Sequence, residues 1–226
     1  MANPEHVKLA SSGPEALDNW RENNPDVELD LEGADLSGVN LAETKIRAAN
    51  LKGADLSGAR LSRANLAGAD LSGANLNEAD FGQAGMAGVN LSGASVVNAN
   101  LFWADLKGAV LKGAVLTSCR MNRVNLIGAD ISGADFSQSN MIEADLRNTD
   151  MTNALFQSSN MNGADLSRAI MPGADFTLAM IRDSMWIATD ARGASFNQAS
   201  LHRSDFTLAK WDDTTNFPEK FDPENT

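Results

Sequence analysis

Bulky apolar residues recur at every fifth position along most of the chain. The series starts at Leu31 and Leu36 and ends at Phe206 and Trp211, and of its 37 positions only Ala191 is small. From residue 34 onward, the positions two before each bulky residue hold only Ala, Val, Ser, Thr or Cys. An α-helix would space its apolar residues by three and four positions and a strand by two, so the pattern predicts neither element.

A five-residue unit with two inward side chains predicts a chain that turns a corner after every unit, and four corners close a square coil of twenty residues. Glycines recur at this longer period, with Asn153 as the one exception among Gly33, Gly53, Gly73, Gly93, Gly113, Gly133, Gly173 and Gly193. Gly and Asn are the residues that accept a positive φ. We therefore expect a left-handed turn at one corner of each coil, and a positive φ at Asn153.

Two features of the core follow from the same register. Coils should lie about 4.8 Å apart, so that four phenylalanines spaced by twenty residues stack on one inner face. These are Phe136, Phe156, Phe176 and Phe196. At Ala191 we expect the indole ring of Trp186, five positions earlier, to fill the space, because protein cores are close-packed.

The repeat resembles that of the pentapeptide-repeat family, whose pattern is A(D/N)LXX. Residues 34–38 read ADLSG and residues 64–68 read ANLAG. The resemblance covers about four fifths of the chain and implies an all-β fold, a right-handed quadrilateral β-helix. The handedness comes from the resemblance alone. About nine coils would make a rod on the order of 45 Å long.

The repeat is expected over residues 29–213, between an N-terminal segment, 1–28, and a C-terminal tail, 214–226. Ser12 as N-cap and Pro14 in the first turn predict one short helix in the N-terminal segment. Its Leu17 and Trp20 are expected to cap the first coil, because an open coil leaves apolar side chains and backbone groups unpaired.

The C-terminal end leaves two alternatives open. Phe217 and Phe221 of the tail either fold over the last coil or leave it free for a partner. A candidate dimer contact near this end combines Met180, Met185, Ile187, Leu208 and Trp211. Some pentapeptide-repeat proteins pair end to end through their C-terminal coils, so the resemblance implies a homodimer as one assembly of this chain.

Composition narrows the function. The chain of 226 residues carries a net charge of −12, which argues against direct nucleic-acid binding because phosphates require clustered Lys and Arg. The single cysteine, Cys119, excludes a disulfide framework, and its inward position predicts a buried, inert thiol. With no long apolar run and no signal-peptide pattern, we expect no membrane insertion and a cytoplasmic location.

Few residues are suited to chemistry. There are two histidines: His6 is expected in a loose terminus, and His202 is expected to point outward. Neither is placed to bind a metal with Cys119 or to activate a serine, so we expect no catalytic residue, metal or cofactor, and a non-enzymatic protein. Asp or Asn precedes the bulky residue at 23 of 37 units, and these short side chains are expected to bond to nearby backbone in the turns.

Outward apolar residues break the polar pattern of the surface. Val97, Phe102 and Trp103 are expected on neighbouring faces, with Ile142 two coils away on the face of Phe102. Interfaces favour Trp and Phe, so these four residues are a candidate partner-contact surface on a rigid scaffold for protein partners. As an alternative, Arg123 could stack on Trp103 within the protein.

Charge is distributed unevenly among the faces. The face around the Leu36–Phe196 column carries no Lys or Arg, and its acidic residues are Asp35, Asp55, Glu78, Asp135 and Asp175. Some pentapeptide-repeat proteins resemble duplex DNA, bind type II topoisomerases such as gyrase and protect them from quinolones. The resemblance therefore implies an alternative function as a DNA mimic. Two weakly basic faces and the lack of loop insertions count against it.

Overall fold

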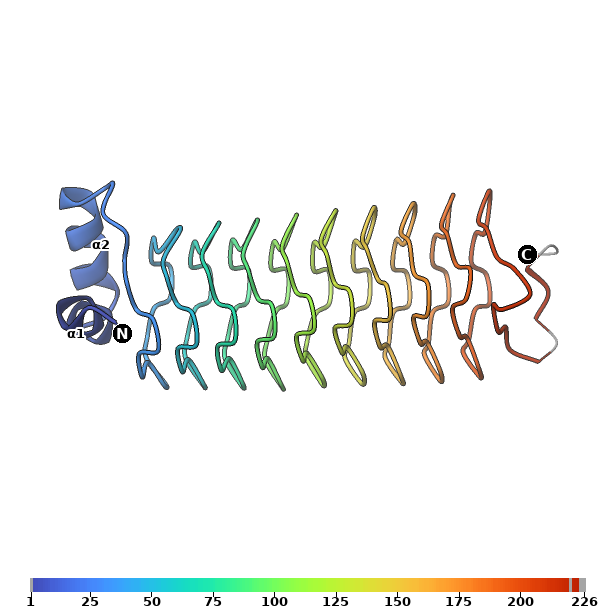
Figure 1. Ribbon diagram of the computed structural model, residues 1–226, viewed down its shortest axis with the longest axis horizontal. Helices are drawn as coiled ribbons and strands as arrows, with labels where there is room; N and C mark the ends of the chain where they lie inside the picture. Colours follow the sequence, from blue (N-terminus) through green and yellow to red (C-terminus); the bar gives the residue numbers. More distant parts are fainter. Residues whose placement is uncertain (1, 220, 224–226) are drawn as a thin grey trace.

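The computed structural model describes residues 2–219 and 221–223. Figure 1 shows a rod of stacked coils, with two short helices at the N-terminal end and the last described residues at the opposite end. The helices are α1 (Pro4–Ser11) and α2 (Pro14–Asn23). From residue 30 to residue 210 the described chain is a solenoid in which one five-residue turn unit follows another.

Parallel backbone pairing at a spacing of twenty residues joins each coil to the next. The pairs run in unbroken register from Asp30↔Asn50 to Asp190↔Lys210. Each pair is an isolated bridge, and the described part of the chain has no strand of consecutive paired residues. The twenty-residue period predicted from the glycine and phenylalanine columns is confirmed.

The unit of residues 54–58 shows why this sequence pattern folds into a coil. The amide of Asp55 donates to the preceding coil at 2.9 Å, and the amides of Leu56 and Gly58 donate to the following coil at 2.7 and 2.8 Å. The amide of Ala54 closes the turn. The fifth amide, of Ser57, donates to Oδ1 of Asp55 at 2.9 Å. The aspartate therefore satisfies the one backbone donor that the coils leave unpaired, which confirms the predicted turn bonding.

Every fifth residue from Gly33 to Leu208 has a positive φ. Asn153 has a φ of 56°, so the prediction for the exception in the glycine column is confirmed. The prediction of one left-handed corner per coil is wrong, because all four corners have this conformation. The sequence obscures this, since the other corners also hold Arg, Gln, Ser and Trp. None of these corners holds Val, Ile or Thr, which are the residues that fit the left-handed region worst.

Both inward series fill the interior, and the predicted phenylalanine column is confirmed. Successive ring centroids are 5.2, 4.8 and 5.1 Å apart, with ring planes within 10° of parallel, in the column of Phe136, Phe156, Phe176 and Phe196. Trp186 is fully buried, and its ring lies edge-on to Phe176 and Phe196. The packing of Trp186 against Ala191 stays a prediction.

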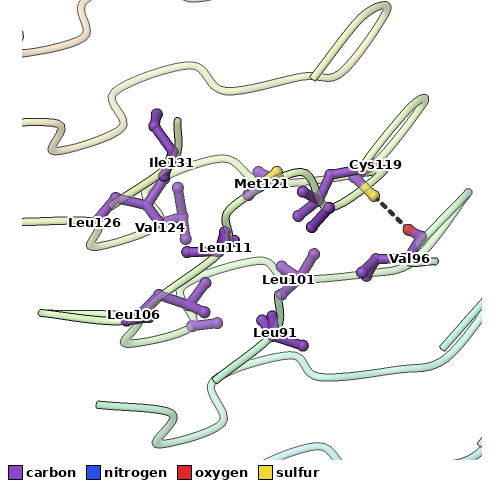
Figure 2. Close-up of a cluster of buried hydrophobic side chains, with 14 of the residues drawn as sticks. Leu91, Val96, Leu101, Leu106, Leu111, Cys119, Met121, Val124, Leu126 and Ile131 are labelled. Atoms are coloured by element: carbon purple, nitrogen blue, oxygen red, sulfur yellow. Dashed lines mark hydrogen bonds between the residues drawn. The ribbon is translucent and has the colours of Figure 1, made fainter. Parts of the chain in front are cut away.

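Figure 2 shows a cluster of buried apolar side chains in the middle coils, with Cys119 at one side of it next to Val96. Cys119 is buried, as predicted, and its Sγ lies 2.8 Å from the carbonyl oxygen of Val96. Burial raises the pKa of the Cys119 thiol to about 12, against a weaker lowering by a backbone hydrogen bond at Ala99. The thiol is therefore held protonated at neutral pH.

The last coil departs from the predicted register. Ser195 pairs with Asn216, a spacing one residue longer than in every earlier coil. This brings Phe217 onto the phenylalanine column, and Phe221 packs edge-on against Phe206 at 5.6 Å. Trp211, predicted as the last inward residue, is instead only partly buried. The tail thus places the Phe217 ring in the inward position that a further regular unit would otherwise fill.

The N-terminal segment contains two helices where the sequence predicts one. Ser12 does not cap α2: its hydroxyl donates back to the carbonyl of Lys8 at 2.8 Å, and Gly13 precedes α2 without a side-chain bond. The unpredicted α1 is capped by Asn3, whose Oδ1 accepts from the amide of Glu5 at 3.0 Å. Because Ser12 is the C-cap of α1, its side chain is no longer available to cap the next helix.

The predicted loose placement of His6 is also wrong. His6 lies in α1, its Nδ1 accepts a hydrogen bond from the amide of Asp30 at 3.0 Å, and its ring lies edge-on to Trp20 at 5.0 Å. Asp18 of α2 accepts in the same way from the amide of Lys45 at 3.0 Å. In later coils the equivalent amides donate to a carbonyl of the preceding coil. The two helices thus provide hydrogen-bond acceptors for backbone amides of the first coil, which has no preceding coil to bond to.

Candidate functional site

The described residues contain no group of three or more His, Cys, Asp or Glu placed to hold a metal ion. Within the same ranges, no helix has the length and apolar character needed to cross a membrane. Each five-residue unit has two buried positions and three positions whose side chains face outward. The outward side chains differ most from unit to unit, so a candidate binding site lies among them.

The aromatic patch comprises Val97, Phe102, Trp103 and Ile142. Phe102 and Trp103 are 38% and 52% exposed, and their ring centroids lie 6.3 Å apart. Val97 and Ile142 are half-buried. The structure brings the two rings together as the sequence predicts, while the two aliphatic side chains contribute less exposed surface.

Trp103 is held by its neighbours but stays open to solvent. It occupies a left-handed corner, with a φ of 58°. The guanidinium of Arg123 lies 5.7 Å from the centre of its ring and also donates to Glu143 at 2.6 Å. The stacking that the sequence offered as an alternative is therefore present. It orients the indole ring and leaves about half of the side chain uncovered.

The structure has a notch next to Phe102 that the sequence did not predict. A hollow of about 230 Å³ opens there, and Gly82 lies one coil before Phe102 at the same position of its unit. Asp80 and Asn100 line it, and Oδ1 of Asp80 accepts from the amide of Gly82 at 3.0 Å and from Nδ2 of Asn100 at 2.7 Å. One sequence feature could have predicted the notch: Gly82 directly follows the bulky residue of its unit, and no other unit has a glycine at that position. We call this hollow the Gly82 notch.

The acidic face carries the five predicted carboxylates, Asp35, Asp55, Glu78, Asp135 and Asp175. The four aspartates bond within their own turns, each accepting from the amide two residues later at 2.9–3.1 Å. For Asp35, hydrogen bonds from the side chain and amide of Ser37 hold the carboxyl pKa below its usual value. The four aspartates therefore stabilise their turns in addition to contributing negative charge to the surface.

The predicted dimer residues differ in their exposure. Met180 and Met185 are exposed, Ile187 is half-buried, and Leu208 is 76% exposed at a left-handed corner. Trp211 lies edge-on to the ring of Phe217. The tail covers inward side chains that an end-to-end contact would use, which favours the monomer over the homodimer, and the homodimer stays a prediction from the sequence.

The model of the pentapeptide-repeat family matches the chain in 8 copies, over residues 27–63, 64–101, 97–133, 119–157, 139–177 and 159–185. HetL, a pentapeptide repeat protein involved in heterocyst differentiation regulation in the cyanobacterium Nostoc, is 25% identical. The similarity covers 85% of this chain and 92% of HetL, with a TM-score of 0.36.

Two further solved structures are similar to this chain. QnrB1, a plasmid-mediated fluoroquinolone resistance protein, is 17% identical over 81% of this chain and 86% of its own, with a TM-score of 0.34. A pentapeptide repeat protein from the thylakoid lumen of Arabidopsis thaliana is 32% identical over 44% of this chain and 63% of its own, with a TM-score of 0.19. No curated protein sequence matches the chain significantly.

Proposed function

Because the chain belongs to the pentapeptide-repeat family, we propose that it is a non-enzymatic, rigid scaffold whose aromatic patch binds a protein partner. The observation that carries this proposal is the pair of exposed rings, Phe102 and Trp103, on a surface that is otherwise mostly polar. Trp at the centre of an interface is among the residues that contribute most to binding energy.

The exposure of Trp103 supports a binding role over a packing role. The left-handed corner does not set Trp103 apart, since 21 corners hold residues other than Gly. Packing within the protein does not explain a tryptophan at this corner, since 52% of the residue is exposed. Arg123 holds the ring in one orientation, so less side-chain entropy is lost when a partner covers it.

The architecture suits a scaffold. As part of the proposal, the repeat forms a right-handed quadrilateral β-helix of about nine coils over residues 29–213, closed at its N-terminal end by the helices of residues 1–28 and followed by the tail of residues 214–226. Backbone bonds in every unit tie each coil to its neighbours, so outward side chains keep fixed relative positions along the rod. We place this protein in the cytoplasm.

Affinity capture from native cytoplasmic extract tests the proposal. Wild-type protein, Trp103→Gln and Leu178→Gln are used as three baits, because Gln83 and Gln138 already occupy left-handed corners and so glutamine should preserve the fold. Leu178→Gln removes a different exposed apolar side chain. A partner retained by wild type and Leu178→Gln, and lost with Trp103→Gln, supports the proposal. Equal retention by all three baits contradicts it.

A second candidate, a DNA mimic that binds gyrase and modulates quinolone sensitivity, depends on the acidic face. Its five carboxylates from Asp35 to Asp175 span seven coil-to-coil spacings, about 34 Å in all. Duplex DNA carries one charge per about 1.7 Å, so the face has a much lower charge density, and we rank this function second. Inhibition of gyrase supercoiling by the purified protein, lost in Asp55→Asn combined with Asp135→Asn, would reverse the ranking.

A further inference from the structure

The aromatic patch is flanked by arginines whose placement the scaffold function does not explain. We propose, on the basis of that function, that the patch recognises an extended acidic segment of a partner protein. One apolar side chain of the segment packs on Phe102 at the edge of the Gly82 notch, and one carboxylate pairs with each of Arg60 and Arg120. This specifies the partner by its chemistry and adds three residues to the surface.

One wall of the notch is suited to an apolar side chain. Phe102 forms this exposed aromatic wall beside the hollow of about 230 Å³, and the other lining side chains are polar or charged, from Glu43, Ser62, Arg63, Asp80, Gln83 and Asn100. Backbone conformation does not require glycine at position 82, because its φ is not positive. An added Cβ would lie 3.2 Å from both Oδ1 of Asp80 and Nδ2 of Asn100 and would take up part of the hollow. The absent side chain thus leaves the floor of the notch open.

Arg60 and Arg120 lie on the same face as the notch, in a column that otherwise holds Asp80 and Asn100 between them. At this position of the unit, Asp and Asn accept a turn hydrogen bond, and a guanidinium has no acceptor with which to replace it. Both arginines are exposed, and neither forms an ion pair with the described residues. The two positions therefore give up a stabilising bond and present a free positive charge.

Around the notch, four arginines outnumber three carboxylates, which favours an acidic over a basic partner: Arg60, Arg63, Arg120 and Arg123 against Glu43, Asp80 and Glu143. Glu43 and Glu143 are already paired, with Arg63 and Arg123. Asp80 uses Oδ1 in two hydrogen bonds. The arginines at 60 and 120 are the groups on this stretch of the face that have no such partner, and paired arginine–carboxylate contacts are among the stronger polar contacts at interfaces.

The distance between Arg60 and Arg120 sets the separation of the two carboxylates in the segment. Arg60 and Arg120 are three coils apart, which is about 14 Å at strand spacing, and an extended chain rises about 3.3 Å per residue. Two carboxylates about four residues apart would reach both arginines, with the apolar residue between them facing the notch. The segment would run along the rod, because the backbone of the coils is already bonded to its neighbours.

Selection from a random heptapeptide phage library on the immobilised full-length protein tests the proposal. The expected result is enrichment of peptides with two acidic residues about four apart and an apolar residue between them. Affinities of the enriched peptides are then measured by fluorescence anisotropy. Gly82→Ser and the double variant Arg60→Asn with Arg120→Asn should each weaken binding at least about tenfold. Added salt should weaken binding to wild type more than to the double variant.

The variants are matched to the fold. Ser57 and Ser132 follow aspartates at the position of Gly82, and Asn100 and Asn140 share the column of the arginines, so each replacement is already used by the repeat. Lys52→Asn removes a charge from another face and should leave binding unchanged. Enrichment of basic or uncharged peptides, no enrichment, or binding insensitive to Gly82→Ser would overturn the inference. The scaffold function would still stand if extract capture depends on Trp103.

Discussion

Phe217 stacks on Phe196 with ring centroids 5.4 Å apart and planes within 8° of parallel, although the two residues are not twenty positions apart. The pairing of Ser195 with Asn216 absorbs the extra residue in the last coil. The inner column of phenylalanines is thus extended by a residue from the tail, which lies outside the regular repeat.

Removing this ring should destabilise the C-terminal end. Phe217→Ala is expected to lower the free energy of unfolding by about 2–3 kcal/mol, somewhat less than a fully buried phenylalanine because Phe217 is partly exposed. Phe217→Leu, which retains more apolar surface, should cost less. Guanidinium unfolding of both variants measures the difference. Equal stability of Phe217→Ala and wild type would mean that the tail does not cover the coil.

The covering of the last coils by the tail also affects whether the chain forms a dimer. Because Phe217 and Phe221 pack against the inward rings of the last coils, we expect the full chain to sediment as a monomer at tens of micromolar. A dimer that dissociates in Met185→Glu combined with Leu208→Glu would instead support the dimer contact predicted from the sequence. A dimer that persists in this double variant would place its interface elsewhere.

The left-handed corners predict a specific ranking of substitutions. Gly113 has a φ of 64°, and an added Cβ there meets no atom within 4 Å, so backbone strain is the main cost of a side chain. Gly113→Val should destabilise by about 1–2 kcal/mol or more. Gly113→Asn should cost less, because Asn153 adopts the same conformation two coils away. Thermal unfolding of the two variants tests the order, and equal stabilities would contradict it.

Cys119 should make stability depend on alkaline pH. The folded thiol has its pKa raised to about 12 from 9.0, so below pH 9.0 it is protonated in both states and has no effect. As the pH rises above 9.0, only the unfolded thiol ionises, and stability falls by up to about 1.4 kcal/mol per pH unit. Cys119→Ala should lose less stability over this range. Identical pH profiles for wild type and Cys119→Ala would argue against the raised pKa.

The regular part of the fold was predictable because one physical unit is repeated without interruption. The stacking of Phe156 and the positive φ of Asn153 follow from columns that the period defines. Phe217 was not predictable, since a single extra residue breaks the period and only packing shows where the chain rejoins it. Ser12 failed as a cap because two helices compete for it, and propensity alone does not rank them.

The candidate site was predictable in part. Exposed Phe102 and Trp103 stand out against a polar consensus, and the sequence places them side by side. The Gly82 notch was missed because the sequence contains many glycines that serve the corners, and Gly82 differs only by its position in the unit. Position in the unit, compared across all coils, is therefore the more informative signal for function in this chain.

The most direct test of the account is the dissociation constant of the purified captured partner, measured by calorimetry against wild type, Trp103→Gln and Leu178→Gln. If the aromatic patch is the docking surface, Trp103→Gln weakens binding by at least about tenfold while Leu178→Gln matches wild type. A dissociation constant for Trp103→Gln within about twofold of wild type, less than 0.5 kcal/mol, would contradict the account.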